Sequence, residues 1–258
     1  MTGYTAAAMT ETTQPHAPHS LVVGGAAGLG LAAARALAGA GHRVSVLDLN
    51  PPPGDAGSAM RHVRADLLSP DGPEAALAEA VAGHGPINHA LFMQRYRGGG
   101  ADPWEGELAV SLGATRRIVE WLAPRFPESQ DCSLLFAGSA AGRFVATEQP
   151  AGYHAAKAAL AQLARYWAVT LGPRGVRSNC VSPAVFVKEE RRELDLERYR
   201  RIAQAFPLRR VPTAEQIARV IAFLCSPAAS CLTGQDIAVD NGLSLLAHAS
   251  LAAGPPSP

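Results

Sequence analysis

Short apolar runs alternate along the chain with longer segments of helical composition. The short runs are rich in β-branched residues or leucine and lie at Leu21–Val23, Val44–Leu49, Ile87–Met93, Ser133–Ala137, Val176–Val181 and Ile237–Val239. The longer segments lie at Leu29–Ala40, Pro73–Ala82, Trp104–Phe126, Tyr153–Leu171 and Thr213–Leu224. The short runs predict buried strands, and a further strand is expected to end just before Asp66. Strands that alternate with helices predict one α/β domain, with a parallel sheet wrapped by helices.

Three segments fall outside this alternation and limit the predicted domain to residues 20–246. Residues 1–19 and 247–258 lack periodicity and are expected to be flexible tails. Residues 188–206 are crowded with Glu, Asp and Arg at their start, which predicts a mobile substrate lid. A salt-bridged surface helix is an equal alternative for this charged segment.

Individual residues predict two helix boundaries. Thr213 followed by Gln216 can form a capping box, which predicts that the last helix begins there. Gly172-Pro173 is expected to end the helix before it.

Composition and charge favour small-molecule chemistry. The 258 residues are 48% hydrophobic and 17% charged, with a net charge of +1, so no strongly basic surface is expected for nucleic acid or an anionic membrane. No apolar stretch approaches the roughly 20 residues of a membrane span. The first 20 residues contain no Lys or Arg and no apolar block, which favours a cytoplasmic protein.

Cysteine and histidine spacing gives no support for a metal site. The four cysteines lack a C-x-x-C pair and are expected to be buried free thiols: Cys132, Cys180, Cys225 and Cys231. The eight histidines are scattered, with no pair at helical metal-binding spacing. We therefore predict no metal.

A glycine cluster follows the first predicted strand and runs into a helix. The segment Val23–Gly30 contains Gly24, Gly28 and Gly30, and Leu29 lies between the last two. Glycine lets the backbone turn tightly and approach a pyrophosphate, while the helix N-terminus offers free N–H groups. The cluster with Leu29 is therefore a candidate phosphate cradle, although glycines alone are a weak signal.

Acidic residues end the next two predicted strands. Asp48 lies about 20 residues beyond the glycines, where a carboxylate meets the ribose hydroxyls of NAD and repels the extra phosphate of NADP. NAD(H) is therefore favoured over NADP(H), and the alternative for Asp48 is a turn residue. Asp66, with its neighbour Leu67, is expected to contact the adenine, although Asp66 could simply open a turn.

A tyrosine and a lysine supply candidate acid–base chemistry. Tyr153 and Lys157 are four residues apart at the start of a predicted helix, so their side chains share one face. Tyrosine, with a pKa near 10, is a poor proton carrier at neutral pH, but a neighbouring ammonium stabilises the phenolate. Ser139 leaves a strand among small residues at the carboxyl edge of the sheet, where its hydroxyl can donate to a substrate oxygen; a turn serine is the alternative.

Together with these residues, three later motifs resemble the short-chain dehydrogenase/reductase family. The motifs are Arg177-Ser178-Asn179-Cys180-Val181-Ser182-Pro183, Leu232-Thr233-Gly234-Gln235 and Val239-Asp240-Asn241-Gly242. The resemblance runs from about Leu21 to Leu245. It implies a Rossmann-like doubly wound parallel sheet of about seven strands with helices on both faces, and a homotetramer or homodimer.

The same resemblance assigns roles to the site residues. It implies hydride transfer at the nicotinamide, with Ser139 and Tyr153 polarising the carbonyl oxygen and Lys157 also holding the nicotinamide ribose. It implies that the segment from Pro183 to Val187, including Val185 and Phe186, lines the nicotinamide.

The chain departs from the family pattern at four places. Val23 replaces a threonine at the glycine loop, and Ala184 and Lys188 replace a glycine and a threonine after Pro183. Phe92-Met93-Gln94-Arg95 replaces Asn-Asn-Ala-Gly, and Phe92 is still expected to lie at the cofactor. Ser111 stands where the family has the asparagine of a proton relay, and its hydroxyl is expected to hold the relay water.

The altered strand end suggests a substrate class. Arg95, Tyr96 and Arg97 should emerge at the carboxyl edge of the sheet beside the catalytic residues. Arginine suits carboxylate or phosphate, so we hypothesise an anionic or sugar-like substrate. Loop arginines that face solvent are the alternative.

The sequence therefore predicts an NAD-dependent oxidoreductase that interconverts a carbonyl and a secondary alcohol, with Tyr153 as general acid/base. Two alternatives stay open at this point. One is a cofactor-binding sensor or scaffold with little turnover, and the other is an epimerase or dehydratase that uses bound NAD.

Overall fold

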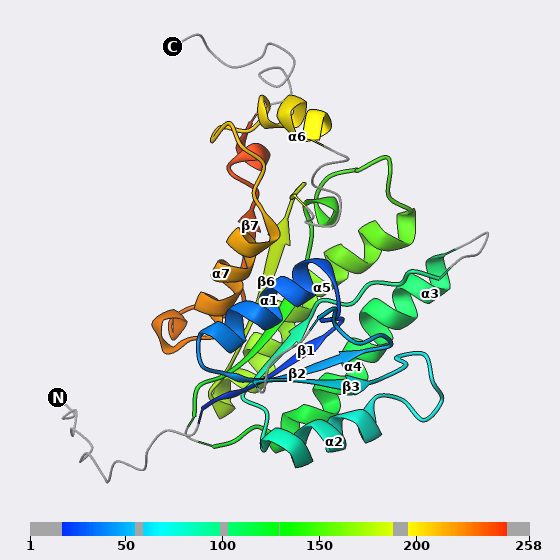
Figure 1. Ribbon diagram of the computed structural model, residues 1–258, viewed down its shortest axis with the longest axis vertical. Helices are drawn as coiled ribbons and strands as arrows, with labels where there is room; N and C mark the ends of the chain where they lie inside the picture. The colour runs from blue at the N-terminus through cyan, green and yellow to red at the C-terminus, as the bar shows by residue number, and fades with distance from the viewer. Residues whose placement is uncertain (1–16, 55–58, 99–102, 129, 188–195, 247–258) are drawn as a thin grey trace, which may run out of the picture.

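The protein is built on a seven-stranded parallel sheet in the order β3-β2-β1-β4-β5-β6-β7 (Figure 1). The computed structural model describes residues 17–54, 59–98, 103–128, 130–187 and 196–246. The strands are β1 His19–Val23, β2 Arg43–Asp48, β3 Met60–Arg64, β4 His89–Phe92, β5 Cys132–Ala137, β6 Val176–Pro183 and β7 Asp236–Val239. The predicted fold class is confirmed. The strand order reverses between β1 and β4, and ligands of such sheets bind beyond the carboxyl ends of the strands at this switch point.

Helices cover both faces of the sheet (Figure 1). They are α1 Gly28–Gly39, α2 Glu74–His84, α3 Trp104–Leu108, α4 Ala114–Leu122, α5 Ala151–Leu171, α6 Leu196–Ala203 and α7 Ala214–Leu224. One apolar cluster joins α1 and α7 to the sheet, and a second joins α2, α4 and α5 to its other face. The predicted capping box at Thr213 and Gln216 is confirmed, and α5 ends at Leu171 before Gly172 as expected.

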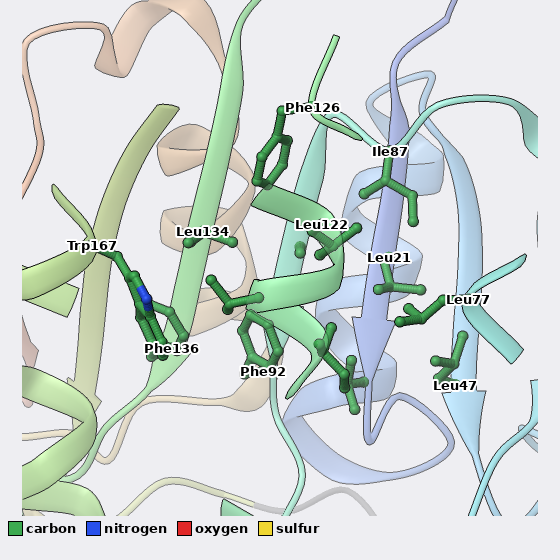
Figure 2. Packing of buried hydrophobic residues seen from close by; sticks show 14 of the residues in the cluster. Leu21, Leu47, Leu77, Ile87, Phe92, Leu122, Phe126, Leu134, Phe136 and Trp167 are labelled. Carbon is green, nitrogen blue, oxygen red and sulfur yellow. The ribbon is translucent and has the colours of Figure 1, made fainter. Parts of the chain in front are cut away.

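An aromatic stack anchors the strands that carry the site. Phe92 at the end of β4 stacks on Phe136 of β5, with ring centroids 5.0 Å apart, and Phe136 stacks in turn on Trp167 of α5 at 5.2 Å (Figure 2). Burying such side chains stabilises the fold by about 1.5–3 kcal/mol each. The stack ties α5, which carries Tyr153 and Lys157, to the ends of β4 and β5.

The predicted limits of the domain need adjustment. Strand β1 begins at His19, within the predicted tail, and Arg43 donates hydrogen bonds to the Ala17 carbonyl. Within the predicted lid, residues 196–203 form helix α6, which agrees with the alternative of a surface helix. Residues 1–16, 188–195 and 247–258 lie outside the described residues, so the mobility of the lid and the tails stays a prediction.

The single helix predicted over Trp104–Phe126 is instead a series of helical segments. Helix α3 passes into a π-helical segment, Ala109–Gly113, in which the amide of Ala114 donates to the carbonyl oxygen of Ala109. Helix α4 follows directly. The Thr115 hydroxyl donates to the Ser111 carbonyl at 2.8 Å, which competes with the regular backbone pattern. Periodicity alone cannot reveal such a bulge, because the apolar face continues through it.

Three of the four cysteines are buried free thiols as predicted, but the prediction is wrong for Cys231, which is exposed. Burial raises the pKa of Cys132, Cys180 and Cys225 to about 12. None of the helices described has both the length and the apolar character needed to cross a membrane.

Candidate active site

The glycine loop between β1 and α1 is a backbone cradle at the switch point. Gly24 and Gly28 have φ values of +76° and +54°, which side-chain-bearing residues rarely adopt. A methyl group on Gly30 would clash with the carbonyl oxygen of Gly24, so the loop closes only over glycine. A methyl group on Gly28 would meet no described atom within 4 Å, so this side of the loop faces open space. Leu29 follows in the first turn of α1 and packs partly against the core.

Asp48 at the end of β2 is tied to the glycine loop. Its Oδ2 accepts a hydrogen bond from the Ala26 amide at 3.0 Å, and its Oδ1 accepts one from the Asn50 amide at 3.2 Å. Asp48 therefore holds the turn and also places a carboxylate beside the cradle. Arg64 stands next to Asp48 in the register of β2 and β3, with an exposed side chain, and the sequence analysis did not connect the two.

Asp66 and Leu67 follow β3 at the same edge of the sheet. The Oδ1 of Asp66 accepts a hydrogen bond from the Leu68 amide at 2.9 Å, so Asp66 does open a turn. Leu67 packs partly against the core. The adenine contact of both residues stays a prediction.

The Tyr153 and Lys157 side chains meet in the first turns of α5. The Nζ atom of Lys157 lies 5.4 Å from the centroid of the Tyr153 ring and donates a hydrogen bond to the Ala137 carbonyl at 2.6 Å. Lys157 is 4% exposed, whereas Tyr153 is half-buried. The bond to Ala137 joins α5 to the end of β5, two residues before Ser139.

Burial lowers the pKa of Lys157 to about 8, and charged neighbours act in both directions. Glu107 and Cys180 raise the pKa, and Arg95 lowers it. The ammonium is therefore held where a modest change of its surroundings alters its charge near neutral pH.

Ser139 lies at the carboxyl edge of β5, as predicted. Its backbone is extended, and its hydroxyl oxygen caps a short helical turn, Ala140–Gly142, by accepting a hydrogen bond from the Ala141 amide at 3.1 Å. The hydroxyl can still donate, because a serine oxygen accepts and donates at once. Its side chain is half-buried, which suits a group that meets a substrate oxygen.

The segment after β6 continues along the same edge. Pro183 is the buried last residue of β6, and Val185 is half-buried. Phe186 packs against the apolar cluster beneath α1 and α7. The Val187 amide donates to the Pro212 carbonyl at 2.8 Å, which fastens this segment to the start of α7.

Comparison with known proteins decides the family. A family model described as enoyl-(acyl carrier protein) reductase matches residues 24–244, which includes the cradle, Ser139, Tyr153 and Lys157. The chain belongs to the short-chain dehydrogenase/reductase family. As a member, it is an oxidoreductase that uses a nicotinamide cofactor.

Two similar proteins have names that describe redox enzymes. The chain is 29% identical over 234 residues to the 3-oxoacyl-[acyl-carrier-protein] reductase MabA of Mycobacterium tuberculosis, covering 87% of this chain and 92% of that protein. It is 31% identical over 238 residues to the oxidoreductase asL5 of Sarocladium schorii, covering 87% and 94%.

Solved structures share the fold over nearly the whole chain. A short-chain dehydrogenase/reductase from Brucella melitensis, titled glucose/ribitol dehydrogenase, superposes with a TM-score of 0.74 at 27% identity and covers 88% of this chain and 96% of its own. The aldohexose dehydrogenase of Thermoplasma acidophilum superposes with a TM-score of 0.79, covering 91% and 97%, and at 23% identity it speaks for the fold alone.

In this short-chain dehydrogenase/reductase, Gln94 rather than Phe92 lies beside the glycine loop. Phe92 was expected at the cofactor, but its side chain is 1% exposed and packs in the core, so it offers no side-chain contact there. Gln94 lies against Gly24 instead: a methyl group on Gly24 would clash with the Gln94 backbone. The Nε2 atom of Gln94 donates to the Thr115 hydroxyl at 2.7 Å, while its buried Oε1 has no hydrogen-bond partner among the described residues.

The residues present fit a bound dinucleotide. The glycine turn leaves backbone space that a side chain would fill, and Asp48 places a carboxylate beside it. The backbone of Gln94 lies against the same loop, and its buried Oε1 has no hydrogen-bond partner among the described residues. Because buried polar atoms are rarely left unpaired, an enclosed water molecule can supply that donor.

Arg95 lies beside Tyr153, the predicted acid–base residue. Its guanidinium carbon is 4.4 Å from the centroid of the Tyr153 ring, and its Nη2 donates to the Gln149 side chain at 2.6 Å. Arg97, two residues on, is exposed. The sequence predicted that Arg95 emerges near the site but not that it stacks on Tyr153.

The Ser111 hydroxyl donates its proton to Glu107, and its contact with a relay water stays a prediction. The residue is 1% exposed, its hydroxyl donates to Oε1 of Glu107 at 2.7 Å, and its carbonyl accepts from Thr115. Glu107 is itself 2% exposed and was missed by the sequence analysis. Its spacing of four residues from Ser111 on a helix is the one signal that could have shown the pair.

Proposed function

We propose that this protein interconverts a carbonyl and a secondary alcohol with NAD(H), and that Tyr153 is the general acid/base. The observation that carries the proposal is the position of the Lys157 ammonium. It is fixed by the Ala137 carbonyl at 2.6 Å and lies 5.4 Å from the Tyr153 ring, at the sheet edge that holds Ser139 and the glycine cradle.

Tyr153, Lys157 and Ser139 have different roles at the substrate oxygen. In reduction, the Tyr153 hydroxyl gives its proton to the carbonyl oxygen, and in oxidation the phenolate takes it back. Lys157 stabilises the phenolate, and Ser139 donates a hydrogen bond to the same oxygen. The nicotinamide cofactor, when bound, supplies or accepts the hydride.

The carboxylate of Asp48 supports NAD(H) as the cofactor. It lies at the glycine loop, bonded to the Ala26 amide, where it favours ribose hydroxyls and repels a phosphate. Arg64 favours NADP(H) instead, since an exposed arginine beside Asp48 could bind that phosphate. Because Asp48 is hydrogen-bonded to the loop and Arg64 lies on the edge strand β3, we favour NAD(H).

The first test is a panel of ketones and aldehydes assayed with NADH and with NADPH. We expect oxidation of NADH by at least one carbonyl compound, with kcat/KM about 10-fold or more above that with NADPH. Absorbance at the nicotinamide band reports turnover, and cofactor fluorescence reports binding. Binding without oxidation across the panel would support a sensor or scaffold instead, and preference for NADPH would overturn the assignment of Asp48.

We also propose that the substrate carries an anionic group near its reacting carbonyl. The guanidinium of Arg95 faces the ring of Tyr153, so it lies within a few ångströms of the place where the substrate oxygen must bind. One N–H group of the Arg95 guanidinium donates to the Gln149 side chain. The remaining N–H groups of the guanidinium suit a carboxylate or phosphate, for which charged hydrogen bonds are worth about 1.5–3 kcal/mol.

Arg95→Ala is expected to raise KM for anionic carbonyl substrates by about 10–100-fold, the equivalent of a charged hydrogen bond. KM for a neutral ester of the same compound should change little. The matched control is Arg97→Ala, which removes an exposed arginine two residues away. Equal losses on the acid and its ester would refute the anionic substrate.

Finally, we propose that the protein assembles as a homodimer or homotetramer. Helix α5 carries large apolar side chains on its outer face, with Tyr166 59% and Val169 76% exposed. Such side chains favour contact with a second copy. Light scattering would give the oligomeric state directly.

A further inference from the structure

The Ser139 hydroxyl is held by the short turn that follows it. Its oxygen accepts a hydrogen bond from the Ala141 amide at 3.1 Å, and the Ser139 carbonyl accepts one from the Gly142 amide at 2.9 Å. The next residue, Arg143, closes the turn with a hydrogen bond from its amide to the Ala140 carbonyl at 3.0 Å. The direction of the Ser139 hydroxyl therefore depends on where this turn is fixed.

A buried carboxylate fixes the far end of the turn to the sheet. The Nη2 atom of Arg143 donates to Oδ2 of Asp236, the first residue of β7, at 2.6 Å and to the Asp236 carbonyl at 3.1 Å. The Asp236 side chain is 5% exposed, whereas that of Arg143 is 45% exposed. A charged hydrogen bond is strengthened when its acceptor is shielded from water. The pair therefore ties the turn after Ser139 to the edge strand of the sheet.

The other oxygen of Asp236 acts on the chain just before Ser139. The Oδ1 atom of Asp236 accepts a hydrogen bond from the hydroxyl of Ser182, on β6, at 2.5 Å. A methyl group on Gly138 would clash with that hydroxyl oxygen, so Ser182 packs against the residue that precedes Ser139. The two oxygens of Asp236 thus hold the chain before Ser139 and after it.

We infer that Asp236 and Arg143 are positioning residues, whose ion pair holds the Ser139 hydroxyl at the substrate oxygen. The inference rests on the proposed function, in which Ser139 donates a hydrogen bond to that oxygen. Both carboxylate oxygens of Asp236 are used within the network, so the pair acts through Ser139 and not on the substrate. A hydrogen-bond donor stabilises the transition state most when its direction is fixed before the reaction.

A purely structural role of the ion pair would look different. If the pair only strengthened the fold, its loss would lower the melting temperature and would affect turnover independently of Ser139. Losses of rate from two independent substitutions multiply, whereas those from two residues that act as a unit do not. A double variant that also carries Ser139→Ala therefore separates the two roles.

The test is Arg143→Met, which keeps an unbranched side chain and removes the guanidinium from an exposed position. We expect kcat for carbonyl reduction to fall about 10-fold, because a small misplacement of a hydrogen-bond donor is costly, while NADH affinity by fluorescence titration and the melting temperature change little. In Ser139→Ala/Arg143→Met, kcat should be no lower than in Ser139→Ala alone. Native kcat in Arg143→Met, or multiplied losses in the double variant, would overturn the inference.

Two conservative variants check that the ion pair is the cause. Arg143→Lys keeps a cation at the end of a long side chain and should recover most of the lost kcat, so a loss equal to that of Arg143→Met would count against the ion pair. Asp236→Asn still accepts from the Ser182 hydroxyl but carries no charge for the guanidinium, and it should be about as slow as Arg143→Met. If Arg143→Met does not fold, Asp236→Asn takes its place in the double variant with Ser139→Ala.

The matched control is Arg61→Met, which breaks an ion pair with Glu79 at the opposite edge of the sheet. The Arg61 side chain is exposed to a similar extent as that of Arg143, and its loss should leave kcat at the native value. A Ser139→Ala variant with native kcat would instead refute the role of Ser139 in the proposed function.

Discussion

Replacing Tyr153 by phenylalanine is expected to lower kcat for carbonyl reduction by about 10²–10⁴-fold, the usual contribution of a positioned general acid. The variant loses only the phenol oxygen. Its ring still fills the same place, so the Arg95 guanidinium at 4.4 Å and the Lys157 ammonium at 5.4 Å keep their aromatic partner. Steady-state assays with the best carbonyl substrate of the panel give kcat, and fluorescence titration should show that NADH binding changes little.

The matched control is Tyr166→Phe, which removes a phenol oxygen from the exposed face of the same helix. It should retain wild-type turnover. Were Tyr153→Phe to reduce the substrate as fast as the native enzyme, the proton would have to come from another group. The assignment of Tyr153, and with it the proposed function, would then fail.

The fold could be predicted because its signals are local. Short β-branched runs between helical segments give the parallel sheet, and glycines followed by a helix give the cradle. The capping box at Thr213 fixed one helix boundary correctly, since both partners lie within one turn. The π-helical segment could not be predicted, because it comes with a hydrogen bond from the Thr115 hydroxyl to the Ser111 carbonyl, which leaves no trace in the hydrophobic periodicity.

The site could be predicted in part. Ser139, Tyr153 and Lys157 carry chemistry in their residue types and spacing, and the structure brings them to one sheet edge. Glu107 and Gln94 could not be predicted, because each matters through burial or through a partner distant in sequence: Glu107 is buried against the Ser111 hydroxyl, and Gln94 packs on Gly24. Phe92 shows the opposite error, since a residue aligned with a cofactor motif here serves the core.

A cluster of buried histidines lies at the opposite edge of the sheet, where the strands begin. His19 opens β1, is 0% exposed, and hydrogen-bonds to the Gly85 carbonyl at 2.7 Å and to the Ser45 hydroxyl at 2.8 Å. His89 opens β4, is 2% exposed, and hydrogen-bonds to the Ser133 hydroxyl at 2.9 Å. Each imidazole is satisfied by neutral partners, so the folded protein favours the uncharged form.

We therefore expect the free energy of unfolding to fall steeply as pH drops below about 6.5. Burial lowers the pKa of His19 to about 4, and burial, with smaller effects of His42 and Arg177, lowers that of His89 to about 3. Between these values and 6.5 the unfolded chain binds more protons than the folded one, so stability is complete above 6.5 and is lost on acidification. Each histidine contributes about 1.4 kcal/mol per pH unit. Two lose about 4 kcal/mol from pH 8 to 5, a large share of the about 5–15 kcal/mol typical of a domain.

Urea unfolding at a series of pH values between 5 and 8 measures the slope of the free energy of unfolding against pH. Substitutions of single histidines then show which residues cause that slope. His89→Gln keeps a group that can bond to Ser133 but cannot gain a proton, so the variant should lose about half of the slope, whatever its stability at pH 8. His62→Gln, at a partly exposed position on β3, removes an imidazole outside the cluster and should leave the slope in place. If the double variant His19→Gln/His89→Gln loses as much stability between pH 8 and 5 as the native chain, the acid sensitivity lies in the carboxylates and not in this cluster.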